Sequence, residues 1–227
     1  MEMNEKKISF IICSNDEFFF SECVRYIQRL IKPEDIEIEL IEIREASSMT
    51  AGYNEGMQSS DAKYKVYMHQ DVFIRNKYFI MDIMNIFKED NKIGLIGLVG
   101  SLVLPADAVM WYGERVAFGS EEVPVENYRY SVMEDGYWEV EAVDGLLMVT
   151  QYDVPWREDL FDGWDYYDIS QCFEMKRRKY SVVVPLQKEP WYIHDDKEIT
   201  NLWNHDKYRR RFLEEYTEDM QVTITKG

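Results

Sequence analysis

Residues 63–74 form a β-prone run that is interrupted by three polar residues near its end. The first part, 63–68, has the alternation that is typical of a strand. His69, Gln70 and Asp71 follow, and the chain then returns at once to apolar residues. A carboxylate inside such a run is costly unless it is paired or coordinated. Because ligands sit at the carboxyl ends of strands in α/β sheets, Asp71 is either a structural cap beside a cleft or a metal and ligand residue.

The chain before this run reads as a strand, a helix and a second strand. The apolar segment 8–13 predicts a buried strand, and the polar cluster 14–17 offers a helix N-cap. A helix to about residue 30 and an alternating strand over 36–43 follow. This order predicts a parallel strand pair with a right-handed crossover connection.

The remaining segments continue the same alternation of strands and helices. We predict helices over about 51–61, 78–89, 169–179 and 201–220, and strands over 93–100, 138–143, 146–150 and 180–185. Residues 105–138 have no helical period and are rich in Tyr, Trp, Gly and Glu, which predicts an irregular insertion. The expected fold class is α/β, with a mostly parallel central sheet, helices on both faces and this aromatic-rich insertion.

Charge and cysteine content narrow the function classes. The formal net charge of −17 argues against a nucleic-acid-binding surface, which needs clustered Lys and Arg. It leaves room for a nucleotide ligand, because a metal ion can neutralise a diphosphate inside an acidic cleft. The three cysteines have no metal-binding spacing and their odd number disfavours a disulfide framework, so a reducing compartment is expected.

The sequence contains no apolar run of membrane-spanning length and no signal-peptide pattern near residues 1–17. We therefore expect a cytoplasmic protein with at most peripheral membrane contact. The basic residues of 207–211 favour a solvated helix face, with contact to an anionic lipid or ligand as the minority interpretation.

Several acidic residues follow apolar segments and are candidates for metal binding or general-base catalysis. In a parallel sheet such strand ends meet at one edge, where carboxylates bind cations or accept protons and an imidazole adds a nitrogen ligand. Each candidate also has an ordinary alternative as a turn, a helix cap or a surface residue. The candidates are Asp71, Asp144, Asp162, Asp165, Asp168 and His194.

Taken together, several segments resemble the family-2-like glycosyltransferases with the GT-A fold. They resemble, in order, the opening strand and turn, the Asn-containing helix, the Asp-x-Asp-type motif, the acceptor-side Asp-Gly element, the catalytic-base region and the late histidine ligand of that family. The segments that carry the resemblance are 8–15, 52–56, 66–72, 143–145, 161–169 and His194.

The resemblance implies one domain over 1–227, with a nucleotide-sugar-binding half (1–100), an acceptor-side half (101–195) and a C-terminal helical tail (196–227). It implies a nucleotide-diphosphate sugar donor, an unknown acceptor (a glycan, a lipid-linked group or a protein) and a divalent metal, Mn²⁺ or Mg²⁺. The implied roles are metal binding by Asp71 and His194, catalysis by Asp168 with Asp165 and Asp162 as rivals, donor binding by Ser14, Asn15, Glu45, Asn54, His69 and Gln70, and acceptor binding by Trp111, Asp144, Gly145 and Trp164.

Two positions depart from the family pattern. His69 replaces the first Asp of Asp-x-Asp, and Tyr167 replaces the Glu of the Glu-Asp pair at the catalytic base. The main hypothesis is an inverting sugar transferase. The alternatives are a non-catalytic nucleotide-sugar or partner-binding module on the same fold and, less favoured, a nucleotidyltransferase.

Overall fold

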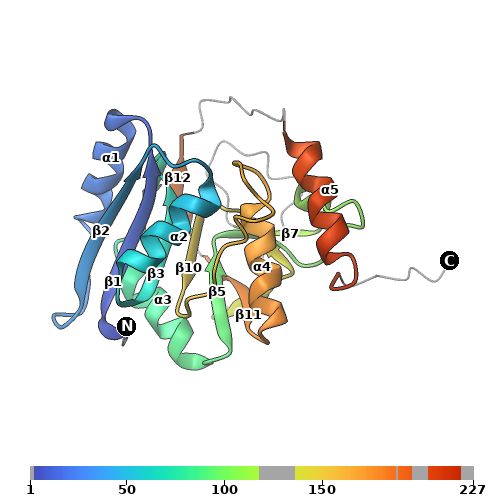
Figure 1. Cartoon of the computed structure of the whole chain (residues 1–227). Coiled ribbons are helices and arrows are strands. Elements are labelled where there is room, and N and C mark those ends of the chain that lie inside the picture. The colour runs from blue at the N-terminus through green and yellow to red at the C-terminus, as the bar shows by residue number, and fades with distance from the viewer. Residues whose placement is uncertain (1–2, 118–135, 188, 196–203, 221–227) are drawn as a thin grey trace.

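The computed structural model describes residues 3–117, 136–187, 189–195 and 204–220. Its largest element is a seven-stranded mixed sheet (Figure 1). In spatial order the strands are β2 (Glu37–Arg44), β1 (Asn4–Ser14), β3 (Ala62–His69), β10 (Leu147–Thr150), β5 (Ile93–Gly97), β11 (Ser181–Pro185) and β8 (Tyr137–Glu139). Five strands run in one direction, while β10 and β8 run opposite to their neighbours. The predicted α/β class is confirmed.

The opening strand–helix–strand unit is confirmed. Helix α1 (Glu17–Ile27) begins after Asp16, whose carboxylate accepts hydrogen bonds from two backbone N–H groups of the first turn. Strand β1 pairs in parallel with both β2 and β3, and the register places Cys13 beside His69. The carboxyl ends of β1 and β3 therefore lie next to each other, at the edge where the polar residues of 69–71 emerge.

Three of the predicted segments differ in detail from the structure. Residues 72–74 leave the main sheet as β4 (Val72–Ile74), which pairs with β12 (Tyr192–His194) in a separate two-stranded sheet. The segment 93–100 is split into β5 and β6 (Val99–Ser101), and 138–143 into β8 and β9 (Ala142–Val143). Strands β7 (Arg115–Ala117), β6 and β9 form a third sheet. A side chain at Gly97 would meet Val143 at 2.4 Å, so glycine permits this close crossing.

Helices cover both faces of the main sheet. Helix α1 and α3 (Phe79–Glu89) contribute to one buried core, with Phe10 of β1 and Met68 of β3. Helices α2 (Met49–Ser59), α4 (Tyr167–Arg177) and α5 (His205–Tyr216) contribute to the other, with Ile11 and Tyr67. Successive residues of β1 and β3 thus point to opposite faces, as strand geometry requires. In Figure 1, α2 and α4 lie in front of the sheet.

The irregular insertion expected over 105–138 lies partly outside the described residues. Its described part contains the short 3₁₀ helix η1 (Met110–Tyr112) and strand β7. In the described part of the chain, no helix has both the length and the apolar character that crossing a bilayer requires.

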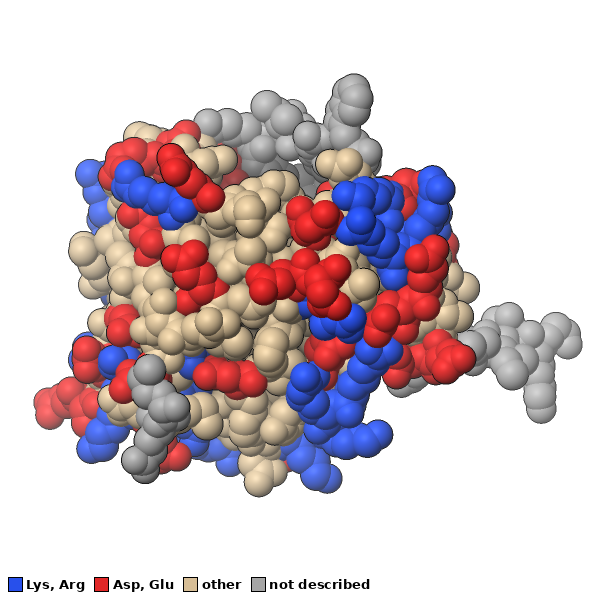
Figure 2. Space-filling model, in the orientation of Figure 1, with Lys and Arg blue, Asp and Glu red and all other residues tan. Residues whose placement is uncertain are grey.

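The basic residues of α5 are paired with nearby carboxylates. Lys207 and Arg211 contact Asp162, and the guanidinium groups of 209 and 210 contact Asp206. Lys/Arg and Asp/Glu side chains accordingly lie interleaved on the side of the molecule that α4 and α5 form (Figure 2). This pairing favours a structural role for the run over contact with an anionic lipid.

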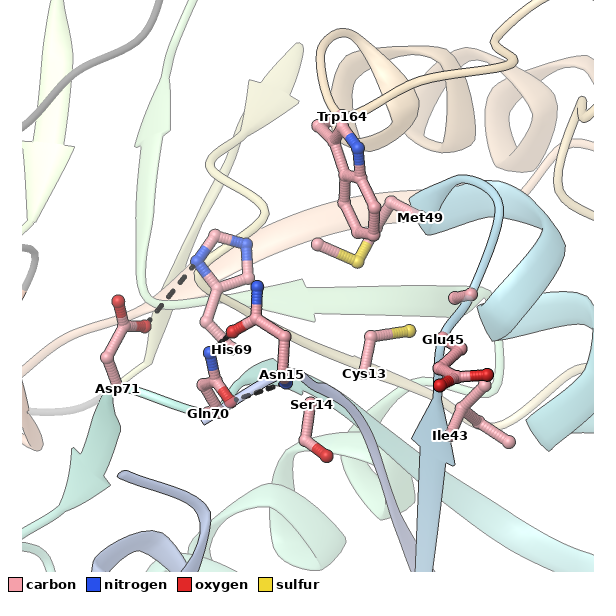
Figure 3. Close-up of a pocket in the computed structure, with 11 residues that line it drawn as sticks. Cys13, Ser14, Asn15, Ile43, Glu45, Met49, His69, Gln70, Asp71 and Trp164 are labelled. Carbon is pink, nitrogen blue, oxygen red and sulfur yellow. Dashed lines mark hydrogen bonds and ion pairs between the residues drawn. The ribbon is translucent and has the colours of Figure 1, made fainter. Parts of the chain in front are cut away.

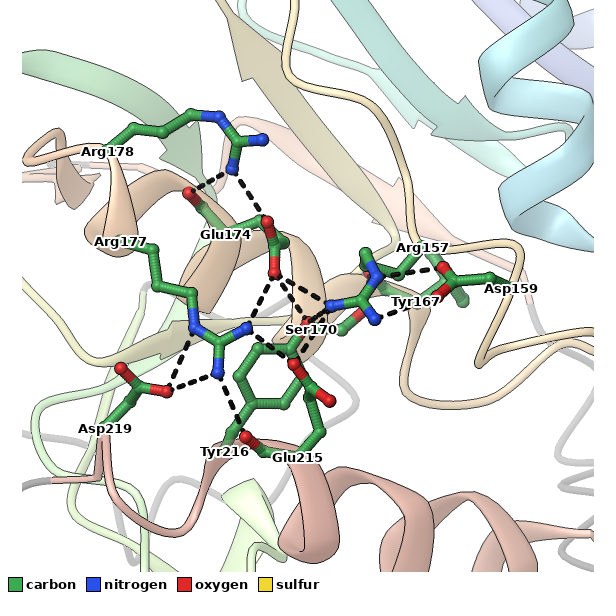
Figure 4. Close-up of polar contacts among 10 residues, drawn as sticks. All are labelled: Arg157, Asp159, Tyr167, Ser170, Glu174, Arg177, Arg178, Glu215, Tyr216 and Asp219. Atoms are coloured by element: carbon green, nitrogen blue, oxygen red, sulfur yellow. Dashed lines mark hydrogen bonds and ion pairs between the residues drawn. The ribbon is translucent and has the colours of Figure 1, made fainter.

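A buried carboxylate joins α4 to α5 (Figure 4). Glu174 accepts hydrogen bonds from Arg157 (3.2 Å), Arg177 (3.2 Å), Arg178 (2.7 Å) and the Tyr216 hydroxyl (3.0 Å). Although burial raises its pKa, bonds from Arg178, Tyr216 and Arg157 hold the pKa of Glu174 below its usual value of 4.5. The stabilisation from this shift is therefore present above about pH 4.5 and is lost as pH falls through the lower folded-state pKa.

Replacing Glu174 with Ala is expected to reduce the free energy of unfolding by about 3 kcal/mol at pH 7, because it removes the acceptor of the buried Tyr216 hydroxyl and of three partly exposed guanidinium groups. Urea denaturation measures this change. The matched control is Glu214→Ala on the exposed side of α5, which should change stability by less than about 0.5 kcal/mol. Equal stabilities for the two variants would contradict a structural role for Glu174.

Candidate active site

A pocket of about 390 Å³ opens at the carboxyl ends of β1, β2 and β3 (Figure 3). This volume lies in the range of small-molecule sites. The lining residues are Cys13, Ser14, Asn15, Ile43, Glu45, Ala46, Met49, His69, Gln70, Asp71 and Trp164. Seven of the candidates named from the sequence are thus brought together: Ser14, Asn15, Glu45, His69, Gln70, Asp71 and Trp164.

One wall of the pocket is braced by side-chain hydrogen bonds. The side-chain oxygen of Gln70 (Oε1) accepts hydrogen bonds from the backbone N–H groups of Asn15 and Asp16, both at 3.0 Å. Its amide nitrogen donates to the Asn15 side chain at 2.6 Å. Ser14 donates to Glu42 at 2.5 Å. These contacts hold the turn after β1 against the end of β3, so the pocket wall is preformed.

The opposite wall carries a backbone outlier. Glu45, which follows β2, has φ +55°, a left-handed conformation that is uncommon outside glycine. Such strained backbone positions persist only where the surrounding structure holds them in place, and they are found preferentially at ligand and active sites. Cys13 lies nearby, and burial, with a contribution from Glu55, raises the pKa of its thiol to about 12. The Cys13 side chain is therefore a neutral, weakly polar part of the wall.

At the other end of the pocket, two imidazoles face one carboxylate. His194 Nε2 lies 3.5 Å and His69 Nδ1 lies 4.0 Å from Asp71 Oδ1. This oxygen is buried and has no hydrogen-bond partner of ordinary geometry among the described residues. One ligand atom from each residue lies within 4.8 Å of the others. An orphaned carboxylate oxygen between two imidazole nitrogens fits a divalent cation, which would give it a partner.

The two small sheet contacts explain why these residues meet. His194 is the last residue of β12 and lies opposite Val72, the first residue of β4. The backbone N–H of Asp195 also donates to the Asp71 carbonyl at 3.0 Å. Burial raises the pKa of Asp71, but the neighbouring His194 and His69 more than offset this and place it below the usual value. The carboxylate is thus charged at neutral pH.

Asp168 and Asp144 form a second polar group, in which Asp168 lies at the start of α4 and Asp144 in the turn before β10. Asp168 accepts hydrogen bonds from the N–H groups of Gly145 (3.0 Å) and Ile169 (2.8 Å). Burial and the nearby charge of Asp144 raise the pKa of Asp168 to about 7. Asp144 itself closes a local turn by accepting from the Leu146 N–H at 2.8 Å, which is the ordinary role of an Asp-Gly sequence.

Strand β10 explains how Asp144 and Gly145 reach this edge of the sheet. The sequence pattern suggested a parallel sheet in which acidic residues follow strands. Asp144 does follow a strand, β9, but β9 belongs to the small sheet that it forms with β6 and β7. In the main sheet Asp144 precedes β10, which runs antiparallel to β3 and β5. The start of an antiparallel strand lies beside the carboxyl ends of its neighbours. Asp144 therefore lies at the predicted edge of the sheet, although the strand that follows it is antiparallel.

Tyr167 contacts His69 and precedes Asp168 at the start of α4, whereas from the sequence it is expected only to replace a Glu. Its hydroxyl lies 2.5 Å from His69 Nε2. A Cβ at Gly145 would lie 2.1 Å from the same hydroxyl oxygen, so only glycine leaves room for it. The preceding residue, Tyr166, has φ +62°, which is a marked outlier for a bulky residue. The spacing of His69 and Tyr167 along the chain contains no signal for this contact.

Asn54 makes contacts inside the protein. Its amide donates to the Trp156 carbonyl and accepts from the Trp156 N–H, both at 2.9 Å, and its side chain is buried. Asn54 therefore ties α2 to the segment after β10. Because it does not line the pocket, its role in donor binding stays a prediction.

Seven further candidates do not line the pocket: Trp111, Asp144, Gly145, Asp162, Asp165, Asp168 and His194. Of these, Trp111 is 43% exposed in η1. Asp165 is half-buried, and burial raises its pKa against the opposing effect of His205. Among the described residues, no hydrogen bond or ion pair joins Trp111 or Asp165 to Asp71 or Asp168, so their acceptor-side and catalytic roles stay predictions.

The architecture and the edge location of the pocket define the class as a GT-A glycosyltransferase fold. Similar solved structures include TarS from S. aureus in complex with UDP (11% identity, TM-score 0.57) and the mannosyltransferase PcManGT from Pyrobaculum calidifontis in complex with GDP-Man and Mn²⁺ (10% identity, TM-score 0.58). A third is GalNAc-T7 with UDP, GalNAc and Mn²⁺ (9% identity, TM-score 0.59). At these identities the likeness concerns the fold.

The family is shown by the sequence itself. Residues 9–216 match the model of the glycosyltransferase-like family, and the chain belongs to that family. A comparison with curated proteins found no significant match. The structural matches cover 95% of this chain for TarS and PcManGT and 81% for GalNAc-T7. The chain in turn spans 40% of one TarS chain, 67% of TarS 1-349, 64% of PcManGT and 43% of GalNAc-T7.

Proposed function

We propose that this protein transfers a sugar from a nucleotide-diphosphate donor to an acceptor hydroxyl, with inversion and with a divalent metal. The observation that carries this proposal is that His194, Asp71 and His69 form one cluster that could hold a cation, that His69 contacts Tyr167, and that Asp168 follows Tyr167 in the chain. The raised pKa of Asp168, about 7, supports a role for this carboxyl group in proton transfer. Family membership and the nucleotide ligands named for the similar structures support the same chemistry.

The donor would occupy the pocket between Glu45 and Asp71. The preformed wall of Ser14, Asn15 and Gln70 would contact the nucleoside, and Trp164, which is 54% exposed at the rim, would cover the sugar. When bound by Asp71 and the imidazoles, a divalent cation supplies positive charge that stabilises the leaving diphosphate. The donor half would be 1–100, since β1, β2 and β3 carry most of the lining.

Asp168 would act as the general base. Deprotonation of the acceptor hydroxyl by Asp168 would allow its oxygen to displace the diphosphate in one step, which inverts the sugar carbon. A pKa of about 7 would suit this task, because about half of the Asp168 side chains are ionised at neutral pH and the carboxylate is a stronger base than an ordinary Asp. The acceptor itself, whether glycan, lipid-linked or protein, would enter from the side of Gly145 and Trp164.

A thermal-shift panel of UDP- and GDP-sugars, with and without Mn²⁺, tests this function. A donor present at about 100 times its dissociation constant adds about 2.7 kcal/mol of stability, which should raise the melting temperature by about 5–10 °C for a chain of this size. The rise should require Mn²⁺. No shift with any nucleotide sugar contradicts the proposal, and a shift without turnover or slow donor hydrolysis supports the non-catalytic binding module.

A further inference from the structure

We propose that His69 is the third metal ligand, through Nδ1, and that Tyr167 holds it in the required tautomer. We further propose that the resulting set of two imidazoles and one carboxylate selects a first-row transition metal over Mg²⁺. This inference deepens the metal dependence proposed above and assigns a ligand role to the residue that departs from the Asp-x-Asp pattern.

The two ring nitrogens of His69 face different partners. Nδ1 points to Asp71 Oδ1 at 4.0 Å, and Nε2 lies 2.5 Å from the Tyr167 hydroxyl (Figure 3 shows His69 and Asp71). A neutral imidazole carries one proton, so a nitrogen that binds a cation must leave the proton on the other nitrogen. With a cation at Nδ1, Nε2–H must therefore donate to the Tyr167 oxygen.

Tyr167 is held firmly enough to serve this purpose. It is 4% exposed, and its ring packs against those of Tyr53 and Trp156, with centroids at 5.9 and 6.3 Å. Gly145 lies so close to the hydroxyl oxygen that a Cβ there would meet it at 2.1 Å. A phenol hydroxyl accepts as well as donates, so its oxygen can accept the imidazole proton. Tyr167 is thus a positioning residue that acts through His69, as outer partners of metal-bound histidines do.

The donor set determines which cation fits. Mg²⁺ prefers oxygen ligands in a near-ideal octahedron, whereas imidazole nitrogens favour transition metals with affinities that rise from Mn²⁺ through Co²⁺. An Asp at position 69 would offer the cation an oxygen ligand, whereas His69 offers it a nitrogen ligand. With His69 and His194 both contributing, we expect Mn²⁺, Co²⁺ and Zn²⁺ each to bind at least about 10-fold more tightly than Mg²⁺.

Calorimetric titration of the whole chain with each metal alone tests the role of Tyr167. Tyr167→Phe keeps the ring and removes the hydroxyl, and it should weaken Mn²⁺ and Zn²⁺ binding by about 10–100-fold. The matched control is Tyr208→Phe, because Tyr208 is equally buried (3%) and its hydroxyl donates to Asp162 at 3.0 Å. That control should bind as the wild type. Unchanged binding by Tyr167→Phe, or equal affinities for Mg²⁺ and Mn²⁺, would overturn the inference.

A spectroscopic signature on the unmodified protein gives a second, independent readout. The chain has three histidines, so long-range ¹H–¹⁵N spectra resolve each ring. With Zn²⁺ bound, His69 should show a proton on Nε2 and a metal-shifted Nδ1. A proton on Nδ1, or a His69 spectrum that Zn²⁺ leaves unchanged, would overturn the inference even if the Tyr167 variant failed to fold.

The same experiments separate this inference from the proposed function. Metal binding as described, together with no stabilisation by any nucleotide sugar, would leave the metal site standing and refute the transferase proposal. Metal-dependent sugar transfer with His69 uncoordinated in the spectra would support the transferase proposal and refute the ligand role of His69.

Discussion

Replacement of Asp168 with Asn is expected to lower the rate of sugar transfer by about 10²–10⁴-fold while donor binding is retained. Asn has the same shape, but it can accept only one of the two hydrogen bonds, from Gly145 (to Oδ2 in Asp168) or from Ile169 (to Oδ1), and it cannot take a proton from the acceptor. Initial rates with a donor found by thermal shift, together with the donor dissociation constant from calorimetry, measure the two effects separately. The comparison variant is Asp165→Asn, which should change the rate by less than about tenfold.

The pH dependence of the reaction gives a further check on Asp168. Because its pKa in the folded protein is raised to about 7, the rate should rise with pH up to about 7 and level off above it. Stability should change in the opposite sense: a carboxyl group with a raised folded-state pKa contributes stability at low pH that is lost as pH rises through 7. Asp168→Asn should flatten both profiles. Transfer at the wild-type rate in that variant, or a profile centred near pH 4, would rule out Asp168 as the base.

The fold was largely predictable because its signals are local. The apolar run 8–13, the capping residue Asp16 and the alternation of 36–43 each specify an element without reference to distant parts of the chain. The errors arose where strands change sheets. Nothing in the local pattern of 93–100 shows that β6 leaves the main sheet, because that break depends on the close approach of Val143 to Gly97.

In the candidate site, too, the residues with a local sequence signal could be predicted, and those positioned by long-range contacts could not. Its strand-end members, such as Asp71 and Gln70, could be placed from the sequence because strand ends meet at one edge. The contacts of Asn54 could not be predicted, since its buried contact with Trp156 joins residues 102 positions apart. Tyr167 was missed for a similar reason: its contact with His69 joins residues 98 positions apart, and a tyrosine is not a usual marker of a metal site.

Replacement of Asp71 with Asn is expected to weaken the Mn²⁺-dependent binding of a nucleoside diphosphate by more than about 100-fold. The loss should exceed the about 10–100-fold typical of outer-shell changes, because Asp71 supplies the only carboxylate of the cluster among the described residues. Calorimetry with UDP and GDP, each with and without Mn²⁺, measures it. Binding without metal should change little, since Ser14, Asn15 and Glu45 remain in place.

Asp195→Asn is the matched control for this variant. It removes the same charge at an exposed position whose backbone N–H already donates to the Asp71 carbonyl, and it should leave the Mn²⁺ effect intact. A loss common to both variants would reflect the charge of the whole face. Retention of the Mn²⁺ effect in Asp71→Asn would show that the cation binds elsewhere or is not used. A loss confined to Asp71→Asn would place the cation where the orphaned oxygen lies between His69 and His194.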